Sequence, residues 1–197
     1  NGSQSVFNTG YTNLTLSGSG VKTIPAGIPL AGMLSMEGTA TVAGSSPSYG
    51  SLSTIRYRGS AVQNTGIELV PSFSGDGGLV IDNPSDVNLT SSLTLSTGLN
   101  LVSGSFNVGA NTLTLNGPPI TLTSGNLATT SASSLVFGGS SAGVYIPSGV
   151  TSLNNLTIDI AGGVTLNSNI TLASGGILTL AGGILDAGSY ILAVTNS

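Results

Sequence analysis

Residues 154–172 read NNLTIDIAGGVTLNSNITL, and a similar stretch occurs earlier in the chain. Residues 77–95 read GGLVIDNPSDVNLTSSLTL and align with it without a gap, at a separation of 77 positions. The alignment places Leu79 on Leu156, and Ile81, Val87, Leu89 and Leu95 also fall on apolar residues of the later stretch. A chain that repeats so long a phrase predicts a repeat architecture.

The similarity extends beyond these two stretches. SGSFNVGANTLTL (103–115) aligns with GGILDAGSYILAV (182–194) at a separation of 79, and TNLTLSGSGV (12–21) matches NNLTIDIAGGV (154–164) if one residue is skipped. The module therefore has roughly 77–80 residues.

The repeat divides the chain into three regions. We expect residues 1–50 to be an N-terminal cap or partial repeat, with Ser3–Leu16 as a possible donor segment. Residues 51–127 form repeat module 1, and residues 128–197 form repeat module 2, which is truncated or continues into a neighbour. The chain opens on Asn1 rather than Met, which favours a processed or excised piece.

The composition is that of a β-protein with few charges. Charged residues make up 5% of the 197 residues, and there are 30 Gly, no Cys and no His. Three basic residues are too few to neutralise a nucleic-acid backbone, and the absence of Cys excludes disulfides and thiolate metal sites. No apolar stretch approaches the roughly 18 residues of a spanning helix. We therefore expect no nucleic-acid partner and no membrane span.

Short runs such as LTL, ITL and TLTL alternate apolar and polar residues, and Gly, Ser-Gly or Asn-Gly separates them. Period two indicates strands with one apolar face. The sequence thus predicts an all-β fold, a parallel β-solenoid or β-helix with about 20–25 residues per coil and about 8–10 coils. The alternative is a β-sandwich built from repeated hairpins.

The C-terminal half contains the string NTLTLNG…SSLVFGG…IPSGVTSLNNLTIDIAGGVTLNSNITLASGGILTLAGGILDAGSYIL. It resembles the β-strand-repeat segments of large secreted surface and adhesin-like proteins of the Bacteroidota, and so does YGSLSTIRYRGSAVQNTGIELVPSFSGDGGLVIDN. The resemblance covers most of residues 12–195 and implies an extracellular or cell-surface stalk, adhesin or filament component. The family offers no catalytic motif to carry over, and its C-terminal sorting domain is missing from residues 1–197.

These observations predict a structural function. We expect an extracellular rod or filament subunit of a cell-surface adhesin, sheath or appendage, whose partners are neighbouring repeats or further copies that add head to tail by strand pairing. The alternative is a carbohydrate- or surface-binding module that uses the loops at 43–50 and 138–149 or the face around Arg56 and Arg58. An ice-binding protein and a polysaccharide-degrading enzyme on a β-helix are further alternatives.

No catalytic residue, cofactor or metal ligand is expected from a chain without His and Cys. Asp82 and Asp86 are close in sequence, but their catalytic pairing would need a fixed separation. SGDGG (74–78) and DNPSD (82–86) offer oxygen ligands for calcium without the spacing of known calcium motifs.

The remaining candidates are surface residues. Arg56, Tyr57 and Arg58 lie in an alternating run, and the two arginines point outward as candidate contacts for an acidic surface glycan. Candidate glycosylation sites begin N-x-T sequons at Asn13, Asn88, Asn155 and Asn169. Ranks of outward Thr can order water and bind ice, but the threonines of the LTL phrases do not recur once per coil in the sequence. These are Thr15, Thr94, Thr114, Thr157, Thr171 and Thr179.

Overall fold

The protein is a parallel β-solenoid. The computed structural model describes residues 2–195, and these residues form 27 short strands and no helix. All strand pairs in the described part of the chain are parallel. The predicted solenoid is therefore confirmed, and the sandwich alternative is wrong, because hairpins would pair their strands antiparallel. No helix of residues 2–195 is long and apolar enough to cross a membrane.

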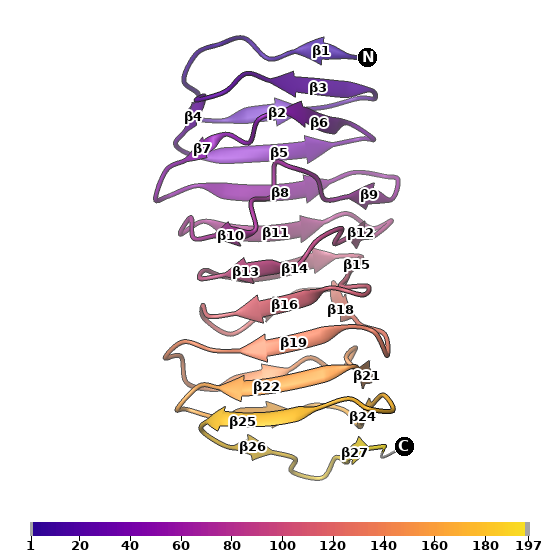
Figure 1. Ribbon diagram of the computed structural model, residues 1–197. Coiled ribbons are helices and arrows are strands. Elements are labelled where there is room, and N and C mark those ends of the chain that lie inside the picture. The colour runs from indigo at the N-terminus through magenta and orange to yellow at the C-terminus, as the bar shows by residue number, and fades with distance from the viewer. Residues whose placement is uncertain (1, 196–197) are drawn as a thin grey trace.

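The chain contributes strands to three faces in turn, so that the strands of one face belong to successive coils (Figure 1). Face 1 consists of β2 (Leu14–Leu16), β5 (Met33–Glu37), β8 (Thr54–Arg58), β11 (Gly78–Asp82), β14 (Leu99–Ser103), β17 (Thr121–Leu122), β20 (Val144–Ile146), β23 (Val164–Leu166) and β26 (Leu185–Asp186).

Face 2 consists of β1 (Gln4–Ser5), β3 (Val21–Ile24), β6 (Thr41–Gly44), β9 (Gln63–Asn64), β12 (Val87–Asn88), β15 (Ser105–Asn107), β18 (Asn126–Ala128), β21 (Ser152–Leu153), β24 (Ile170–Leu172) and β27 (Leu192–Val194). Face 3 consists of β4 (Pro29–Leu30), β7 (Ser48–Tyr49), β10 (Ser72–Phe73), β13 (Leu93–Leu95), β16 (Thr112–Leu115), β19 (Ser134–Phe137), β22 (Asn155–Asp159) and β25 (Leu178–Gly182).

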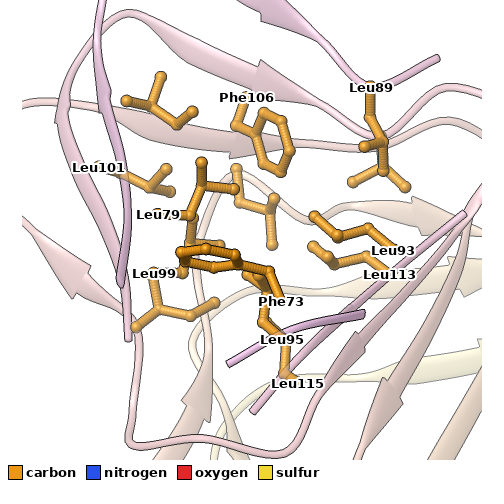
Figure 2. Packing of buried hydrophobic residues seen from close by; sticks show 14 of the residues in the cluster. Phe73, Leu79, Leu89, Leu93, Leu95, Leu99, Leu101, Phe106, Leu113 and Leu115 are labelled. Atoms are coloured by element: carbon orange, nitrogen blue, oxygen red, sulfur yellow. The ribbon is translucent and has the colours of Figure 1, made fainter. Parts of the chain in front are cut away.

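The apolar residues of the alternating runs point into the solenoid and form one core along its length. In β13, Leu93 and Leu95 are buried and Thr94 is half-buried on the outside, as period two requires. Figure 2 shows leucines of faces 1 and 3 meeting Phe73 of face 3 and Phe106 of face 2 in the interior. Because each coil buries its apolar side against the coils above and below, no coil has a core of its own.

The stacking period is about 21 residues: Leu34 pairs with Ile55 in the next coil, 21 positions on. The 77-residue sequence repeat therefore spans about three and two-thirds coils and relates strands of different faces. Leu79 lies in β11 of face 1, and its counterpart Leu156 lies in β22 of face 3. The three faces are thus interchangeable in sequence. The coil stack runs without a break across both module boundaries, through the pairs β5–β8 and β16–β19.

Face 1 is hydrogen-bonded continuously from β2 to β17, whereas faces 2 and 3 are interrupted at the third coil. These interruptions lie between β6 and β9 and between β7 and β10, and two more separate β17 from β20 on face 1 and β18 from β21 on face 2. Ile55 pairs with Leu79 at a separation of 24, so this coil is longer than its neighbours. The extra length lies in the segment 65–71, which carries the buried Glu68. The first coils belong to the same stack, since β1 pairs with β3 and β2 with β5.

Candidate functional site

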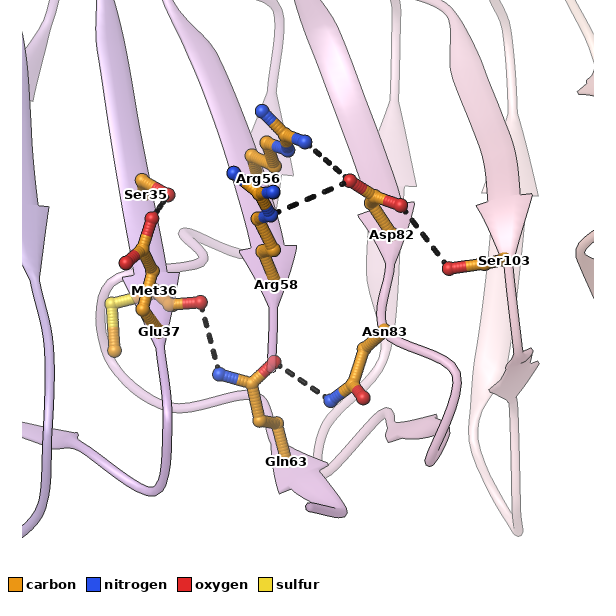
Figure 3. A network of polar contacts seen from close by, with 9 residues as sticks. All are labelled: Ser35, Met36, Glu37, Arg56, Arg58, Gln63, Asp82, Asn83 and Ser103. Atoms are coloured by element: carbon orange, nitrogen blue, oxygen red, sulfur yellow. Dashed lines mark hydrogen bonds and ion pairs between the residues drawn. The ribbon is translucent and has the colours of Figure 1, made fainter. Parts of the chain in front are cut away.

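Four of the ten charged residues of the chain gather on the outer side of face 1, in strands β5, β8 and β11. We call Glu37, Arg56, Arg58 and Asp82 the charged cluster (Figure 3). Arg56 Nη2 donates a hydrogen bond to Asp82 Oδ2, and Arg58 Nε lies 3.9 Å from the same oxygen. Both arginines are therefore directed at one carboxylate.

Asp82 is the centre of this cluster. Its Oδ1 accepts a hydrogen bond of 3.1 Å from Ser103 Oγ in the next coil. The hydrogen bond from Arg56, helped by that of Ser103 and by the charge of Arg58, holds the pKa of Asp82 below its usual range, against a smaller effect of burial. The carboxylate is thus ionised at neutral pH, and both of its oxygens already accept hydrogen bonds.

The structure places the predicted glycan contacts in two environments. Arg56 and Arg58 point outward, as the alternation predicts, and Arg58 is the more exposed, with 59% of its side chain accessible. Tyr57 is fully buried in the core and is not available to a ligand on the outer surface. A glycan contact at Arg56 and Arg58 stays a prediction, and it would have to compete with Asp82 for both guanidinium groups.

Tyr57 points across the core to Glu68, a carboxylate that is only 1% exposed. Tyr57 Oη donates to Glu68 Oε1 at 2.7 Å, and the N–H of Gly66 donates to the same oxygen at 2.7 Å. Tyr49 Oη donates to the backbone oxygen of Glu68 at 2.5 Å. Among the described residues, Glu68 Oε2 has no hydrogen-bond partner. These contacts attach the extra segment of the third coil to Tyr57 of the same coil and to Tyr49 of the coil above.

Burial, and after it the charge of Glu68, raises the pKa of Tyr57 well above 10. The same two causes raise the pKa of Tyr49. Both phenols therefore remain protonated donors far into the alkaline range.

A second buried polar group lies where face 1 turns into face 2. Gln63 Nε2 donates to the backbone oxygen of Met36 at 3.0 Å, and Asn83 Nδ2 donates to Gln63 Oε1 at 2.9 Å (Figure 3). Gln63 and Asn83 are both buried. They connect successive coils through side chains, as the backbone ladders do elsewhere.

The four sequon asparagines do not have the same environment. The Oδ1 atoms of Asn13, Asn155 and Asn169 accept backbone N–H groups of the following coil, at 2.8–3.0 Å. Asn88 instead belongs to a ladder on face 2, in which Asn88 Nδ2 donates to Asn64 Oδ1 at 2.9 Å and Asn107 Nδ2 donates to Asn88 Oδ1 at 2.8 Å. A glycan on Asn88 would be attached to Nδ2, the atom that donates in the ladder. Glycosylation of the four sites stays a prediction.

Four of the six outward threonines named above lie in one column on face 3. The pairings align Ser72, Thr94, Thr114, Val136, Thr157 and Thr179 in register, one residue per coil. Thr15 lies on face 1 and Thr171 on face 2. On face 3 these threonines therefore share one column, although Ser72 and Val136 take the place of threonine in two of its six coils. The irregular lengths of the connecting segments conceal the regularity in the sequence.

A neighbouring column on the same strands holds Thr112, Ser134 and Asn155. Strands of one sheet lie about 4.7–4.9 Å apart, so these hydroxyl and amide groups repeat at that interval along the axis. Face 3 thus presents two columns of uncharged polar groups in its middle coils, one of them interrupted by Val136.

Two of the candidate calcium and catalytic carboxylates, Asp82 and Asp86, already have partners. Asp82 is paired with Arg56, and Asp86 Oδ1 accepts the N–H of Ser105 at 2.7 Å, with Asp86 at a φ of 76°. Within residues 2–195, the Asp and Glu side chains form no group of three or more that could hold a metal ion. Calcium binding at 74–86 stays a prediction without a formed site.

Three features of the site were not predicted from the sequence: the buried Glu68, the asparagine ladder and the buried Lys22. Lys22 has a sequence signal, because the alternation of VKTI places it on the same side as Ile24. The ladder has a weaker signal in the repeated pairs QN, VN and FN, which becomes visible only once the coil period is known. Glu68 has none, since GIELV does not alternate.

Comparison of the chain with known protein families, with curated proteins and with solved structures finds no match. The function is therefore inferred from the geometry of the solenoid and from the residues described above.

Proposed function

We propose that the chain is a stiff structural segment of an extracellular protein, a rod or filament subunit within a cell-surface adhesin, sheath or appendage. The observation that supports it is the continuity of the stack: one apolar core and parallel ladders connect every coil from β2 to β27. Bending such a stack would break ladder hydrogen bonds on one face, so it resists deformation. Nine coils at strand spacing correspond to a rod of about 40–45 Å.

The surface chemistry agrees with this proposal. Hydroxyl, amide and glycine groups dominate the outer positions, and only three Lys and Arg residues offer the flexible basic side chains that trypsin-like proteases cut after. Lys22 is 2% exposed, and Arg56 is directed at Asp82. A spacer outside the cell needs this kind of resistance to proteolysis.

The test is immunogold labelling of the source cells with antibodies raised against the folded rod. Intact cells should be labelled at a distance from the membrane that exceeds the length of one rod. Labelling that appears only after the cells are permeabilised would contradict an extracellular location. Trypsin digestion of the purified chain provides a second readout, since the folded rod should survive at enzyme ratios that degrade the chain in urea.

The array on face 3 supports a second candidate function, the binding of an ordered solid surface such as ice. The test compares ice recrystallisation in the presence of the chain and of two matched variants. Thr114→Tyr places a bulky ring in the middle of the column, whereas Thr15→Tyr places the same ring on face 1. The candidate requires activity in the wild type that Thr114→Tyr lowers and Thr15→Tyr leaves unchanged. If the wild type does not affect ice recrystallisation, ice binding is excluded as a function.

A further inference from the structure

The hydrogen-bonded ladder of face 3 is interrupted inside the stack, at the third coil. Among residues 2–195, β7 pairs only with β4 and β10 pairs only with β13, although β7 and β10 belong to successive coils. Their inward side chains still meet in the core, where the rings of Tyr49 and Phe73 lie with their centroids 5.3 Å apart. The backbones thus separate on the outer side while the core remains closed beneath them.

Backbone polar groups face this interruption from both sides. The N–H groups of the residues before and after Tyr49 donate to the coil above, both at 2.8 Å. The N–H and C=O of Tyr49 therefore point the other way, toward β10. The C=O groups of the residues before and after Ser72 accept N–H groups of the coil below, so the N–H and C=O of Ser72 point back toward β7. In the described part of the chain these four groups have no ladder partner, and they need a hydrogen-bond partner of another kind.

The interruption coincides with a cavity of about 380 Å³. Its apolar wall includes Tyr49 and Val70, which are both half-buried. Three exposed serines line its mouth: Ser51, Ser72 and Ser74. The volume lies within the range of roughly 300–1,000 Å³ of small-molecule sites, which combine apolar walls with a few placed polar groups.

The chemistry of the lining indicates an uncharged ligand with many hydroxyl groups. None of the lining residues carries a charge, so the cavity lacks the guanidinium or ammonium groups that bind anions and the carboxylates that bind metal ions. Serine hydroxyls, N–H groups and C=O groups together supply both donors and acceptors. A sugar hydroxyl likewise donates and accepts, and the C–H groups of a sugar ring pack against an apolar wall.

An extended polypeptide does not fit this site. A strand added between β7 and β10 would need them about 9–10 Å apart, which is twice the strand spacing. Contacts between the two coils close the interruption on both sides. Ser46 Oγ donates to the backbone oxygen of Ile67 ahead of the two strands, and the N–H of Asp76 donates to the oxygen of Ser51 after them, at 2.7 Å. A strand could not continue past these contacts, whereas a compact ring can enter from the outside.

We propose that this cavity binds one neutral sugar residue, either free or as part of a polysaccharide. The unpaired backbone groups of Tyr49 and Ser72 and the serine hydroxyls hold the hydroxyl groups of the sugar, and its ring packs against Tyr49 and Val70. The cavity includes the end of the loop at 43–50, which the sequence offers as a carbohydrate contact. The site goes beyond the structural function and does not rest on it, because a rod can carry such a site or lack it.

Saturation-transfer difference NMR on the purified chain tests the proposal with the methyl glycosides of glucose, galactose, mannose and N-acetylglucosamine. At least one glycoside should give a signal. Ser72→Trp places a bulky ring at the mouth of the cavity and should abolish that signal. Thr94→Trp is the matched control, because Thr94 is the register partner of Ser72 in the next coil, where the ladder is complete, and it should retain the signal.

A second variant covers the case in which the tryptophan disturbs the coil. Ser51→Ala combined with Ser74→Ala removes two hydroxyl groups without adding volume and should weaken the signal, with an unchanged far-UV circular dichroism spectrum. A wild type that gives no signal with any of the four glycosides overturns the proposal. Equal signals from the wild type and all variants overturn it as well.

Two further arms identify the ligand more closely. Cosedimentation of the wild type, but not of Ser72→Trp, with insoluble cellulose, chitin or agarose would assign the site to a polysaccharide. A glycoside signal without cosedimentation would assign it to a free sugar or a short oligosaccharide. The synthetic peptide SSLTLST, which copies residues 91–97, is the probe for strand addition. If this peptide binds and no glycoside does, the interruption is a peptide site and the proposal is overturned. None of these outcomes depends on whether the rod is extracellular.

Discussion

At the scale of single residues, the carboxylate of Asp82 receives both arginines of the chain, and its removal leaves two guanidinium groups without their acceptor. Because the folded state lowers the pKa of Asp82, the carboxylate stabilises the fold above its unfolded pKa of about 3.9 and stops doing so as the pH falls through the folded value. We expect Asp82→Asn to lower the free energy of unfolding at pH 7 by about 0.5–1 kcal/mol. Urea titrations at pH 7 and pH 2 should show a larger difference at the higher pH.

Tyr57 has the opposite dependence on pH. Its pKa in the folded state is raised, so its contribution is complete below the unfolded pKa of about 10 and decreases as the pH rises further. We expect Tyr57→Phe to cost about 1–2 kcal/mol at pH 7, because Glu68 Oε1 loses a donor in the core. The difference between wild type and variant should narrow above pH 10 in urea titrations. Tyr190→Phe, at a 40% exposed position, is the control and should change little.

At the scale of elements, the asparagine ladder stabilises face 2 through side chains as well as backbone. Asn88→Ala removes both side-chain hydrogen bonds that connect β9, β12 and β15, at an expected cost of about 1–2 kcal/mol. Ala128 is the next residue in register, paired with Asn107, so Ala128→Asn should extend the ladder and raise the thermal midpoint. Differential scanning calorimetry of the two variants should give shifts of opposite sign. Shifts of the same sign would show that the ladder does not act as a unit.

The strands themselves were predictable from the sequence, because alternation is a local property. The runs LTL at 93–95 and ITL at 170–172 form β13 and β24 with the expected buried and outward sides. Which strand pairs with which was harder to predict from the sequence. The connecting segments differ in length, so Thr94 and Thr114 pair at a separation of 20 and Leu113 and Leu135 at 22.

The candidate site was predictable only in part for the same reason. The outward direction of Arg56 and Arg58 follows from the alternation, but their acceptor Asp82 comes from the next coil, 26 residues after Arg56. Glu68 is buried because Tyr57 and Gly66 supply donors inside the core, and no local pattern encodes that combination. These features depend on contacts between coils, which can be predicted only when the register of neighbouring coils is known.

At the scale of the whole molecule, the coil and not the 77-residue module is the unit that can be removed. Deleting residues 113–134 joins Thr112 to Leu135, the register partners of Ser134 and Leu113, so the chain continues in phase with one coil fewer. We expect a folded rod with an unchanged circular dichroism spectrum and a urea m-value lower by about one-ninth, since less surface is exposed on unfolding. Deleting residues 113–123, about half a coil, would bring strands of the wrong face beneath β13 and should leave the protein unfolded or aggregated. If the two deletions have equal effects, the stack does not depend on the coil register, and the 77-residue module would then be the better candidate for the folding unit.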